Sequence, residues 1–451
     1  MSEFALSKKI IVIALGVLFS AFLSYIFFSD AQLQKGFFIL FVCAGLWMTE
    51  IIPLAVTALL VPVISYFLKV LDAGAAMAPF SSTIIYLFMG GFTLAALLQK
   101  HGIDRWLANA VIGITKGRVW LSVIGFFAVT SFLSMWMSNT ATTAMMIPIA
   151  VALVGSEYPK MRTMLILGTA YAANIGGNGT MVGSPPNGIA VSALDIDFFE
   201  WFAVGFPTML ILFPFVIFSL WIIIRPESKI ALNKVENVDF EWTPRAKGTV
   251  VLFVFTVICW IFSRYINELL GLKNFDRMIA ILITAIAPML GLISWKDLEK
   301  KIGWGILLLF GGGLCLSKVL TETGTTKFLA ESLFLSISGS PTWIVIIACI
   351  AVMIFLTEIS SNTGSAAIFI PIMIALSDQF SDSVTFALVF GVGLAANCAF
   401  MLPVATPPNL IVYGSNLFNI NQMMRAGLAL NIIGIILVPI IAIKLVPYFL
   451  G

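Results

Sequence analysis

The sequences MSNTATTAMMIP at residues 137–148 and SSNTGSAAIFIP at residues 360–371 follow one pattern. Each places Ser-Asn-Thr inside an otherwise apolar run, and a proline stands eight residues after the threonine. Polar groups in apolar surroundings are unfavourable unless they have partners. The double occurrence therefore indicates that both stretches serve one purpose.

The composition places the chain in a membrane. Of its 451 residues 60% are hydrophobic and 10% charged, whereas a soluble domain carries about 25% charged residues. The net charge of +3 is too small to indicate nucleic-acid binding. The sequence has a single histidine, His101, and five cysteines without C-x-x-C spacing. This set of residues argues against a His/Cys metal site and against a disulfide framework.

Apolar runs predict membrane-spanning helices, each near the roughly 20 residues that cross the hydrocarbon core. The runs lie at 10–28, 37–49, 52–68, 82–99, 202–224, 247–266, 277–294, 302–320 and 425–449. The first is too long for the apolar part of a signal peptide. Four longer regions are interrupted by polar residues, glycine or proline, namely 119–155, 161–194, 341–377 and 384–415.

The distribution of basic residues among the loops predicts how the chain is oriented in the membrane. Lys100, Arg105 and Arg118 lie in one connection, further basic residues fill 225–247, and the short 195–200 loop is acidic. Because cytoplasmic loops carry the excess of lysine and arginine, the N-terminus is predicted to be cytoplasmic.

The triplets belong to an internal repeat with an offset of 222 or 223 residues. Matching pairs are FMGG at 88–91 with FGGG at 310–313, AAN at 172–174 with 395–397, and SPPN at 184–187 with TPPN at 406–409. A constant offset indicates duplication. If each triplet region enters and leaves the membrane on one side, five crossings separate corresponding points, so the copies are inverted.

The predicted fold is an all-α polytopic membrane protein with about 11 transmembrane helices and two re-entrant hairpins. The predicted divisions are an N-terminal segment with the first helix, two repeats containing the hairpins 119–155 and 341–377, and a cytoplasmic linker. The N-terminal segment is 1–36, the first repeat 37–225, the linker 226–248 and the second repeat 249–451. Inverted repeats with interrupted segments are typical of secondary transporters that bind substrate at the repeat interface.

The residues of the interrupted segments are of the kinds that bind an anion together with cations. A helix begins after each triplet, and its free N–H groups, with the hydroxyls and amides, can bind a carboxylate. The breaks GGNGTMVGSPPN (176–187) and LPVATPPN (402–409) leave carbonyls unpaired, which suits Na⁺. No lysine or arginine occurs in 119–159, 163–224 or 328–424, so bound cations must neutralise a dianion there. Glu358 is interpreted as a hydrogen-bonded structural group, with a proton carrier as the alternative.

The paired SNT motifs, GSPPN and ATPPN resemble the divalent anion:Na⁺ symporter (DASS) family, with its INDY-like bacterial dicarboxylate transporters, from about residue 37 to the end. The resemblance implies a homodimer in which a transport domain moves like an elevator along a scaffold domain. It implies substrate contacts by Ser138, Asn139, Thr140, Ser184, Ser361, Asn362, Thr363 and Thr406. It implies one Na⁺ site at Ser134, Ser138, Asn139 and Gly183, and another at Thr357, Ser360, Asn362 and Ala405.

The predicted function is Na⁺-coupled import of C4-dicarboxylates such as succinate, malate or fumarate across the bacterial cytoplasmic membrane. Its partners would be the diacid, sodium ions and membrane lipid. Dicarboxylate exchange without Na⁺ stays open, and so does a channel. An enzyme is disfavoured because the sequence offers no nucleophile and base pair.

Overall fold

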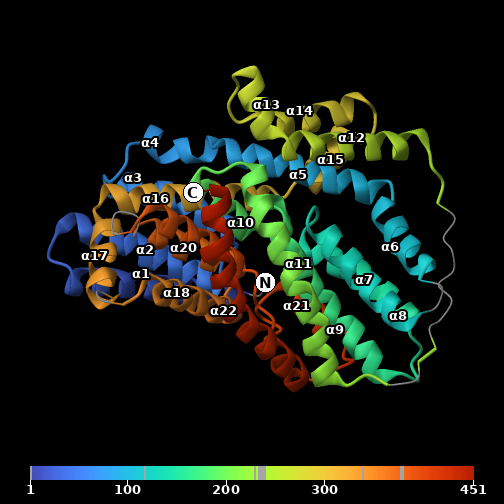
Figure 1. The fold of residues 1–451 in the computed structure, drawn as a ribbon. Helices are drawn as coiled ribbons and strands as arrows, with labels where there is room; N and C mark the ends of the chain where they lie inside the picture. The colour runs from blue at the N-terminus through green and yellow to red at the C-terminus, as the bar shows by residue number, and fades with distance from the viewer. Residues whose placement is uncertain are drawn as a thin grey trace.

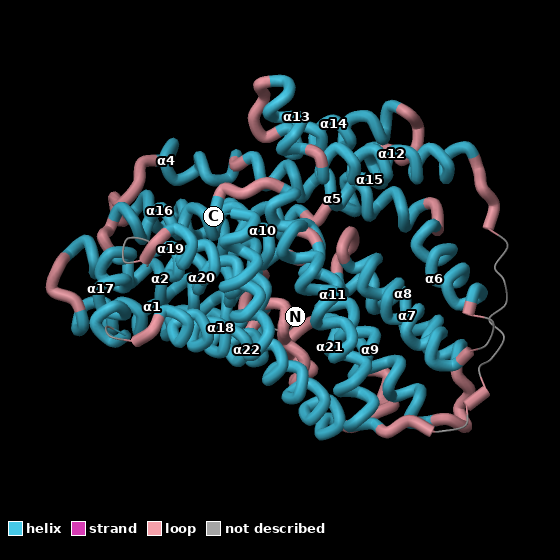
Figure 2. The backbone as a smooth tube through the Cα atoms, in the orientation of Figure 1, coloured by secondary structure: helices cyan, strands magenta, loops and turns pink. Residues whose placement is uncertain are grey.

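The computed structural model describes residues 3–115, 118–227, 230–231, 240–337, 340–375 and 380–450. Helices form the regular structure of these residues, which contain no strand (Figure 2). Most of the predicted linker 226–248 lies outside the described residues.

The helices follow the predicted segments closely, with two short helices before the fourth span. The first half contains α1 (Glu3–Phe27), α2 (Ala31–Thr49), α3 (Leu54–Phe67), α4 (Ala73–Met77), η1 (Ala78–Ser81), α5 (Thr83–Lys100), α6 (Ile103–Ile114), α7 (Val119–Ser134), α8 (Asn139–Leu153), α9 (Pro159–Gly176), η2 (Gly177–Gly179), η3 (Met181–Gly183), α10 (Pro185–Leu194) and α11 (Phe198–Ile224). The second half contains α12 (Pro244–Ile261), α13 (Ser263–Leu270), α14 (Phe275–Met289), α15 (Trp295–Lys301), α16 (Trp304–Glu322), α17 (Thr325–Ile337), α18 (Thr342–Ile359), α19 (Asn362–Ala375), α20 (Asp382–Ala395), α21 (Pro407–Tyr413) and α22 (Ile420–Leu450).

Eight helices among the described residues are long and apolar enough to cross a membrane. They include α18, which the sequence assigns to a hairpin arm. Several other predicted crossings consist of shorter helices, such as α3 and α20. The chain is therefore a multi-pass membrane protein, and the total of about 11 crossings stays a prediction.

Both Pro-Pro motifs break a helix, as predicted. The helix α9 ends at Gly176 and α10 begins at Pro185, while α20 ends at Ala395 and α21 begins at Pro407. Proline is tolerated at the first position of a helix, where its missing N–H would have no intrahelical partner. The segments between the broken helices thus bring free backbone groups into the interior.

Each Ser-Asn-Thr triplet lies where two contacting helices meet. The first hairpin consists of α7 and α8, and the second of α18 and α19. In Figure 1 α7 and α8 run side by side next to α9, with which both are in contact. The second hairpin contacts α20 in the same way.

Repeat-related residues meet between the two halves of the chain. The Phe88 ring, from α5, lies 4.5 Å from the ring of its counterpart Phe310, from α16. The side chains of Asn187 and Asn409 also make matching bonds. Asn187 donates to the carbonyls of Gly177 and Thr180 at 2.7 and 2.8 Å. Asn409 donates to those of Ala399 and Leu402, each at 3.0 Å. The duplicated sequence therefore builds a duplicated structure.

The turn between α10 and α11 is fixed to α14. The Arg277 guanidinium, from α14, lies 3.0 Å from the Asp195 carboxylate and donates to the Thr83 hydroxyl at 2.7 Å. The helix α11 begins with a capping box between Asp197 and Glu200. These polar contacts join the turn before α11 to α5 and α14, which pack against each other along one edge in Figure 1.

Candidate functional site

The first triplet stands at the N-terminus of α8. The Ser138 hydroxyl is exposed and accepts a bond from the Ala141 N–H at 3.2 Å, which makes Ser138 the N-cap. Asn139 and Thr140 follow in the first turn and are half-buried. The N–H groups of a first turn lack intrahelical partners and favour anions. The tip can therefore present backbone donors and hydroxyls to a carboxylate.

The Asn139 side chain faces three oxygen atoms. Its amide group lies 2.7 Å from the Ser134 hydroxyl, 3.2 Å from the Gly183 carbonyl and 3.3 Å from the Ala173 carbonyl. With its nitrogen turned toward them, the amide donates hydrogen bonds to these oxygens. In the opposite orientation the Asn139 amide oxygen points toward them. The four oxygen atoms of Asn139, Ser134, Gly183 and Ala173 then lie together, and the two carbonyls receive no hydrogen bond from Asn139. Such a group of oxygen ligands suits a cation.

The second tip repeats this arrangement. The Thr357 hydroxyl donates to the Asn362 amide oxygen at 2.6 Å and lies 3.0 Å from the Ala396 carbonyl. Thr357 corresponds to Ser134 in the repeat, and Ala396 corresponds to Ala173. Ser361, Asn362 and Thr363 are half-buried.

Five asparagines form hydrogen bonds between the repeats. The buried Asn397 donates to Asn178 at 2.6 Å and Asn187 at 2.8 Å, and accepts from the Ser184 hydroxyl at 2.6 Å. Its counterpart Asn174, in the first repeat, makes the corresponding contacts with the second repeat. Asn174 donates to the Ala399 carbonyl at 3.2 Å and lies 3.4 Å from oxygens of both Thr406 and Asn409. Each AAN motif thus completes the Pro-Pro-Asn turn of the other repeat.

The structure brings together part of each predicted ion site. Ser134, Asn139 and Gly183 meet at the first tip, and Thr357 and Asn362 at the second. The Ser360 hydroxyl instead accepts a bond from Ser365 at 3.2 Å, and Ala405 is buried. Ser184 and Thr406 lie in the asparagine network, and among the described residues neither hydroxyl bonds to a triplet side chain.

Sequence reasoning missed the asparagines and two alanine carbonyls. The AAN and PPN motifs were visible as repeats, but their pairing across the repeats was not. The carbonyls of Ala173 and Ala396 carry no side-chain signal at all.

The two tips differ in what covers them. The helices α10 and α19, which follow SPPN and the second triplet, contact each other and α16. The helices α8 and α21 contact each other and α9, but neither makes a comparable contact with α5 or α16 in the described part of the chain. Val404 and Leu410 beside this face are 72% and 59% exposed. Among the described residues, neighbouring helices therefore cover the first hairpin less than the second.

Glu358 supports the second break. Its carboxylate accepts from the backbone N–H groups of Phe400, Met401 and Leu402 at 2.7 to 3.1 Å, and from the Asn431 amide at 2.7 Å. It is 3% exposed. These bonds fit the structural interpretation of Glu358, because the carboxylate holds the chain that leads into the TPPN turn.

We expect Gly183→Ala to disrupt the first tip. An added Cβ would lie 2.6 Å from the Gly177 carbonyl oxygen and 3.1 Å from that of Met135. Both are backbone atoms, so the Gly183 carbonyl would have to move away from Asn139. Uptake that depends on Na⁺ should fall about tenfold or more, as when a ligand is misplaced. Gly16→Ala serves as the control, because an added Cβ there would meet no atom within 4 Å and Gly16 lies on α1, outside both tips. Equal uptake by Gly183→Ala and wild type would contradict this reasoning.

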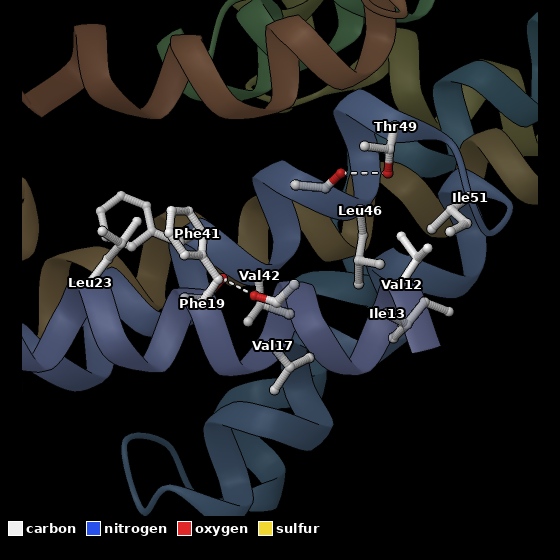
Figure 3. A pocket seen from close by; sticks show the side chains of 13 residues that line it. Val12, Ile13, Val17, Phe19, Leu23, Phe41, Val42, Leu46, Thr49 and Ile51 are labelled. Carbon is white, nitrogen blue, oxygen red and sulfur yellow. Dashed lines mark hydrogen bonds between the residues drawn. The ribbon is translucent and has the colours of Figure 1, made fainter. Parts of the chain in front are cut away.

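A separate cavity of about 300 Å³ lies between α1 and α2 (Figure 3). Its lining is mostly apolar, with Val12 and Val17 from α1 and Leu46 from α2. The Ser20 and Thr49 hydroxyls in it bond carbonyls of their own helices at 2.8 and 2.7 Å. The cavity therefore offers no polar group for an ionic substrate.

Comparisons with known proteins identify the family of this chain. Residues 44–391 and 277–449 match the family model described as citrate transporter. The chain is 39% identical over 437 residues to an uncharacterized transporter of Haemophilus influenzae, covering 94% of each chain. It is 32% identical over 494 residues to the sodium-dependent dicarboxylate transporter SdcS of Staphylococcus saprophyticus, covering 98% of this chain and 92% of SdcS.

Two solved structures share the fold. The Alcanivorax borkumensis YdaH transporter has a TM-score of 0.57 at 12% identity, covering 81% of this chain and 85% of that chain. The Neisseria gonorrhoeae MtrF structure has a TM-score of 0.53 at 14% identity, covering 84% of each chain. The family matched here consists of transporters rather than enzymes. The fold, the duplicated tips and these matches show that the chain belongs to the citrate and dicarboxylate transporter family, to which the DASS resemblance pointed.

Proposed function

We propose that this protein is a Na⁺-coupled symporter that imports C4-dicarboxylates such as succinate, malate or fumarate. The observation that carries the proposal is the matched oxygen cluster at each tip. Ser134, Asn139 and two carbonyls gather at the first, and Thr357, Asn362 and one carbonyl at the second. Oxygen ligands from side chains and unwound backbone are those that Na⁺ takes in secondary transporters.

The charge of the substrate requires these cations. The segments around both triplets contain no lysine or arginine. A buried unpaired charge is unfavourable in a membrane. Sodium ions bound beside Asn139 and Asn362 would neutralise the dianion without a fixed basic side chain.

The proposed binding uses one tip for each carboxylate. Ser138, Asn139 and Thr140 would bind one end of the diacid, and Ser361, Asn362 and Thr363 the other. The first turns of α8 and α19 would add backbone N–H groups. Ser184 and Thr406 would shape the pocket wall through the asparagine network, in which both hydroxyls already take part.

The proposed mechanism is alternating access by an elevator movement, in a homodimer, with the N-terminus in the cytoplasm. With that orientation the exposed face of α8 and α21 opens to the cytoplasm, so the structure corresponds to an inward-open state. Na⁺ would bind first and fix the Asn139 and Asn362 amides with their oxygens toward the ion. The loaded hairpins, α9 to α11 and α20 to α22 would then move along α2, α5, α14 and α16.

The relative SdcS is named a sodium-dependent dicarboxylate transporter. This name supports both the proposed Na⁺ coupling and the proposed dicarboxylate substrate. Exchange of dicarboxylates without Na⁺ is the second candidate, because the triplets alone bind the anion in either case. Citrate, named by the family model, is the competing substrate. Two intact triplets without a basic residue favour the smaller dianion.

Uptake of radiolabelled succinate into proteoliposomes tests the proposal. An inward Na⁺ gradient should drive accumulation, and choline in place of Na⁺ should leave only background. Equal uptake in both salts, increased by preloaded diacid, would identify an exchanger. Unlabelled citrate added in excess should compete more weakly than unlabelled malate. The reverse order would overturn the assignment to C4-dicarboxylates.

A further inference from the structure

A cavity of about 320 Å³ lies between α10, α16 and α19, on the side where the tips are covered. Its size is at the lower end of the range for small-molecule pockets, about 300–1,000 Å³. The walls combine apolar residues with the polar side chains Ser192, Ser317, Lys318, Thr321 and Glu322. It thus differs from the apolar cavity between α1 and α2, because it can satisfy a charged ligand.

Among the described residues that line this cavity, Lys318 is the only basic one. It is half-buried, and its ammonium group donates to the Ala75 carbonyl at 3.3 Å. Within the described residues no carboxylate lies within ion-pair distance of it. Glu322 is exposed, so water and salt screen its charge. The Lys318 ammonium therefore lines the cavity without an ion-pair partner among the described residues.

The duplicated architecture shows that the fold itself does not require this lysine. Lys318 follows FGGG on α16 at the position where the first repeat has Ala96 on α5. Ala96 is buried, and the helices α5 and α16 are otherwise built alike around Phe88 and Phe310. The positive charge thus exists on one side of the transporter and is absent from the equivalent position on the other.

We propose that this cavity is a capture site for the dicarboxylate arriving from outside, with the Lys318 ammonium as its counter-charge. The inference rests on the proposed function and on its orientation, which places the cavity at the external face. There α10 and α19 block the way to the tips in this state. An anion held beside Lys318 is next to the helices that must separate from α16, and it reaches the triplets when they do.

The proposed capture site should affect the KM for substrate on one side of the membrane only. Charged groups near a substrate path raise the local concentration of the opposite charge and the association rate, most strongly at low ionic strength. Lys318 should therefore lower the KM for external substrate and leave the KM for cytoplasmic substrate unchanged. It should also leave the Na⁺ dependence unchanged, because it is not part of either oxygen cluster.

The experiment compares Lys318→Gln, Lys318→Arg and wild type in intact cells and in inverted membrane vesicles, with labelled succinate and Na⁺. For Lys318→Gln we expect the external KM to rise about three- to tenfold at low ionic strength, with the maximal rate retained. The KM measured in inverted vesicles should not change, and Lys318→Arg should restore the external KM. Lys327→Gln is the matched control, since Lys327 is exposed on the neighbouring α17 and lies 3.9 Å from Glu331.

An unchanged external KM in Lys318→Gln, or an equal rise on both sides, would overturn the capture site and leave the proposed function intact. Inhibition of wild type by an impermeant fatty-acid analogue that Lys318→Gln relieves, without a change in succinate KM, would assign the cavity to lipid carboxylates and also overturn it. A wild-type protein that transports no dicarboxylate would overturn both proposals.

Discussion

Asn139→Ala is expected to abolish Na⁺-dependent uptake, with a loss of roughly 100-fold or more, because one substitution would remove both a proposed cation ligand and a proposed substrate contact. The Asn139 amide is the group that meets Ser134 and the carbonyls of Gly183 and Ala173. Uptake into proteoliposomes under an Na⁺ gradient measures the effect. The repeat-related Asn362→Ala should show a loss of similar size, since Asn362 meets Thr357 in the same way.

Asn139→Asp separates two roles of this side chain. An aspartate keeps the oxygen that would bind Na⁺ and loses the nitrogen that donates to the carbonyls. If the oxygen binds the ion, Na⁺ should still raise the melting temperature of Asn139→Asp in detergent and should fail to do so for Asn139→Ala. Stabilisation of both variants to the wild-type extent would remove Asn139 from the ion site. Gel filtration establishes that each variant is folded.

Asn397→Leu is expected to cause the largest loss of stability. Leucine has a similar size, but it leaves Asn178, Asn187 and Ser184 without their partner. Each buried polar group without a bond costs about 1–3 kcal/mol, so the loss should be roughly 3 kcal/mol or more. Thermal unfolding in detergent measures it as a lower melting temperature.

Asn419→Ala provides the matched control for that experiment. Asn419 is exposed, and its side chain only caps the start of α22 by accepting from the Gln422 N–H at 3.0 Å. Loss of such a cap costs about 1 kcal/mol. A melting temperature of Asn397→Leu equal to that of Asn419→Ala would show that the asparagine network contributes little to holding the repeats together.

The sequence was sufficient to predict features set by local chemistry. Pro185 and Pro407 cannot continue a helix, so the two breaks follow from the residues alone. The pairing of Ser134 with Asn139 and of Thr357 with Asn362 was implied by the family resemblance, and both pairs are in contact in the structure. The constant offset pairs Asn187 with Asn409, but the matching bonds that their side chains make to backbone carbonyls were visible only in the structure.

Features that depend on the whole fold could not be predicted in this way. The offset links Asn174 with Asn397 as equivalents, but it gives no sign that each bonds to the other repeat. Which side is closed depends on a difference in free energy between two arrangements of the same helices, and no single residue determines it. The cavity beside Lys318 is formed by the helices α10, α16 and α19, which lie together in this arrangement.

The exchanged asparagines also bear on how such a chain could arise. A protein containing one repeat would have its AAN asparagine and its Pro-Pro-Asn turn, yet the turn bonds to the asparagine of the other copy. A single-repeat ancestor could complete these bonds only in a pair of identical chains related by two-fold symmetry. With inverted repeats, that pair requires the same polypeptide to insert into the membrane in both orientations. Gene fusion would then have fixed one chain in each orientation and freed the two copies to diverge, as Lys318 and Ala96 have done.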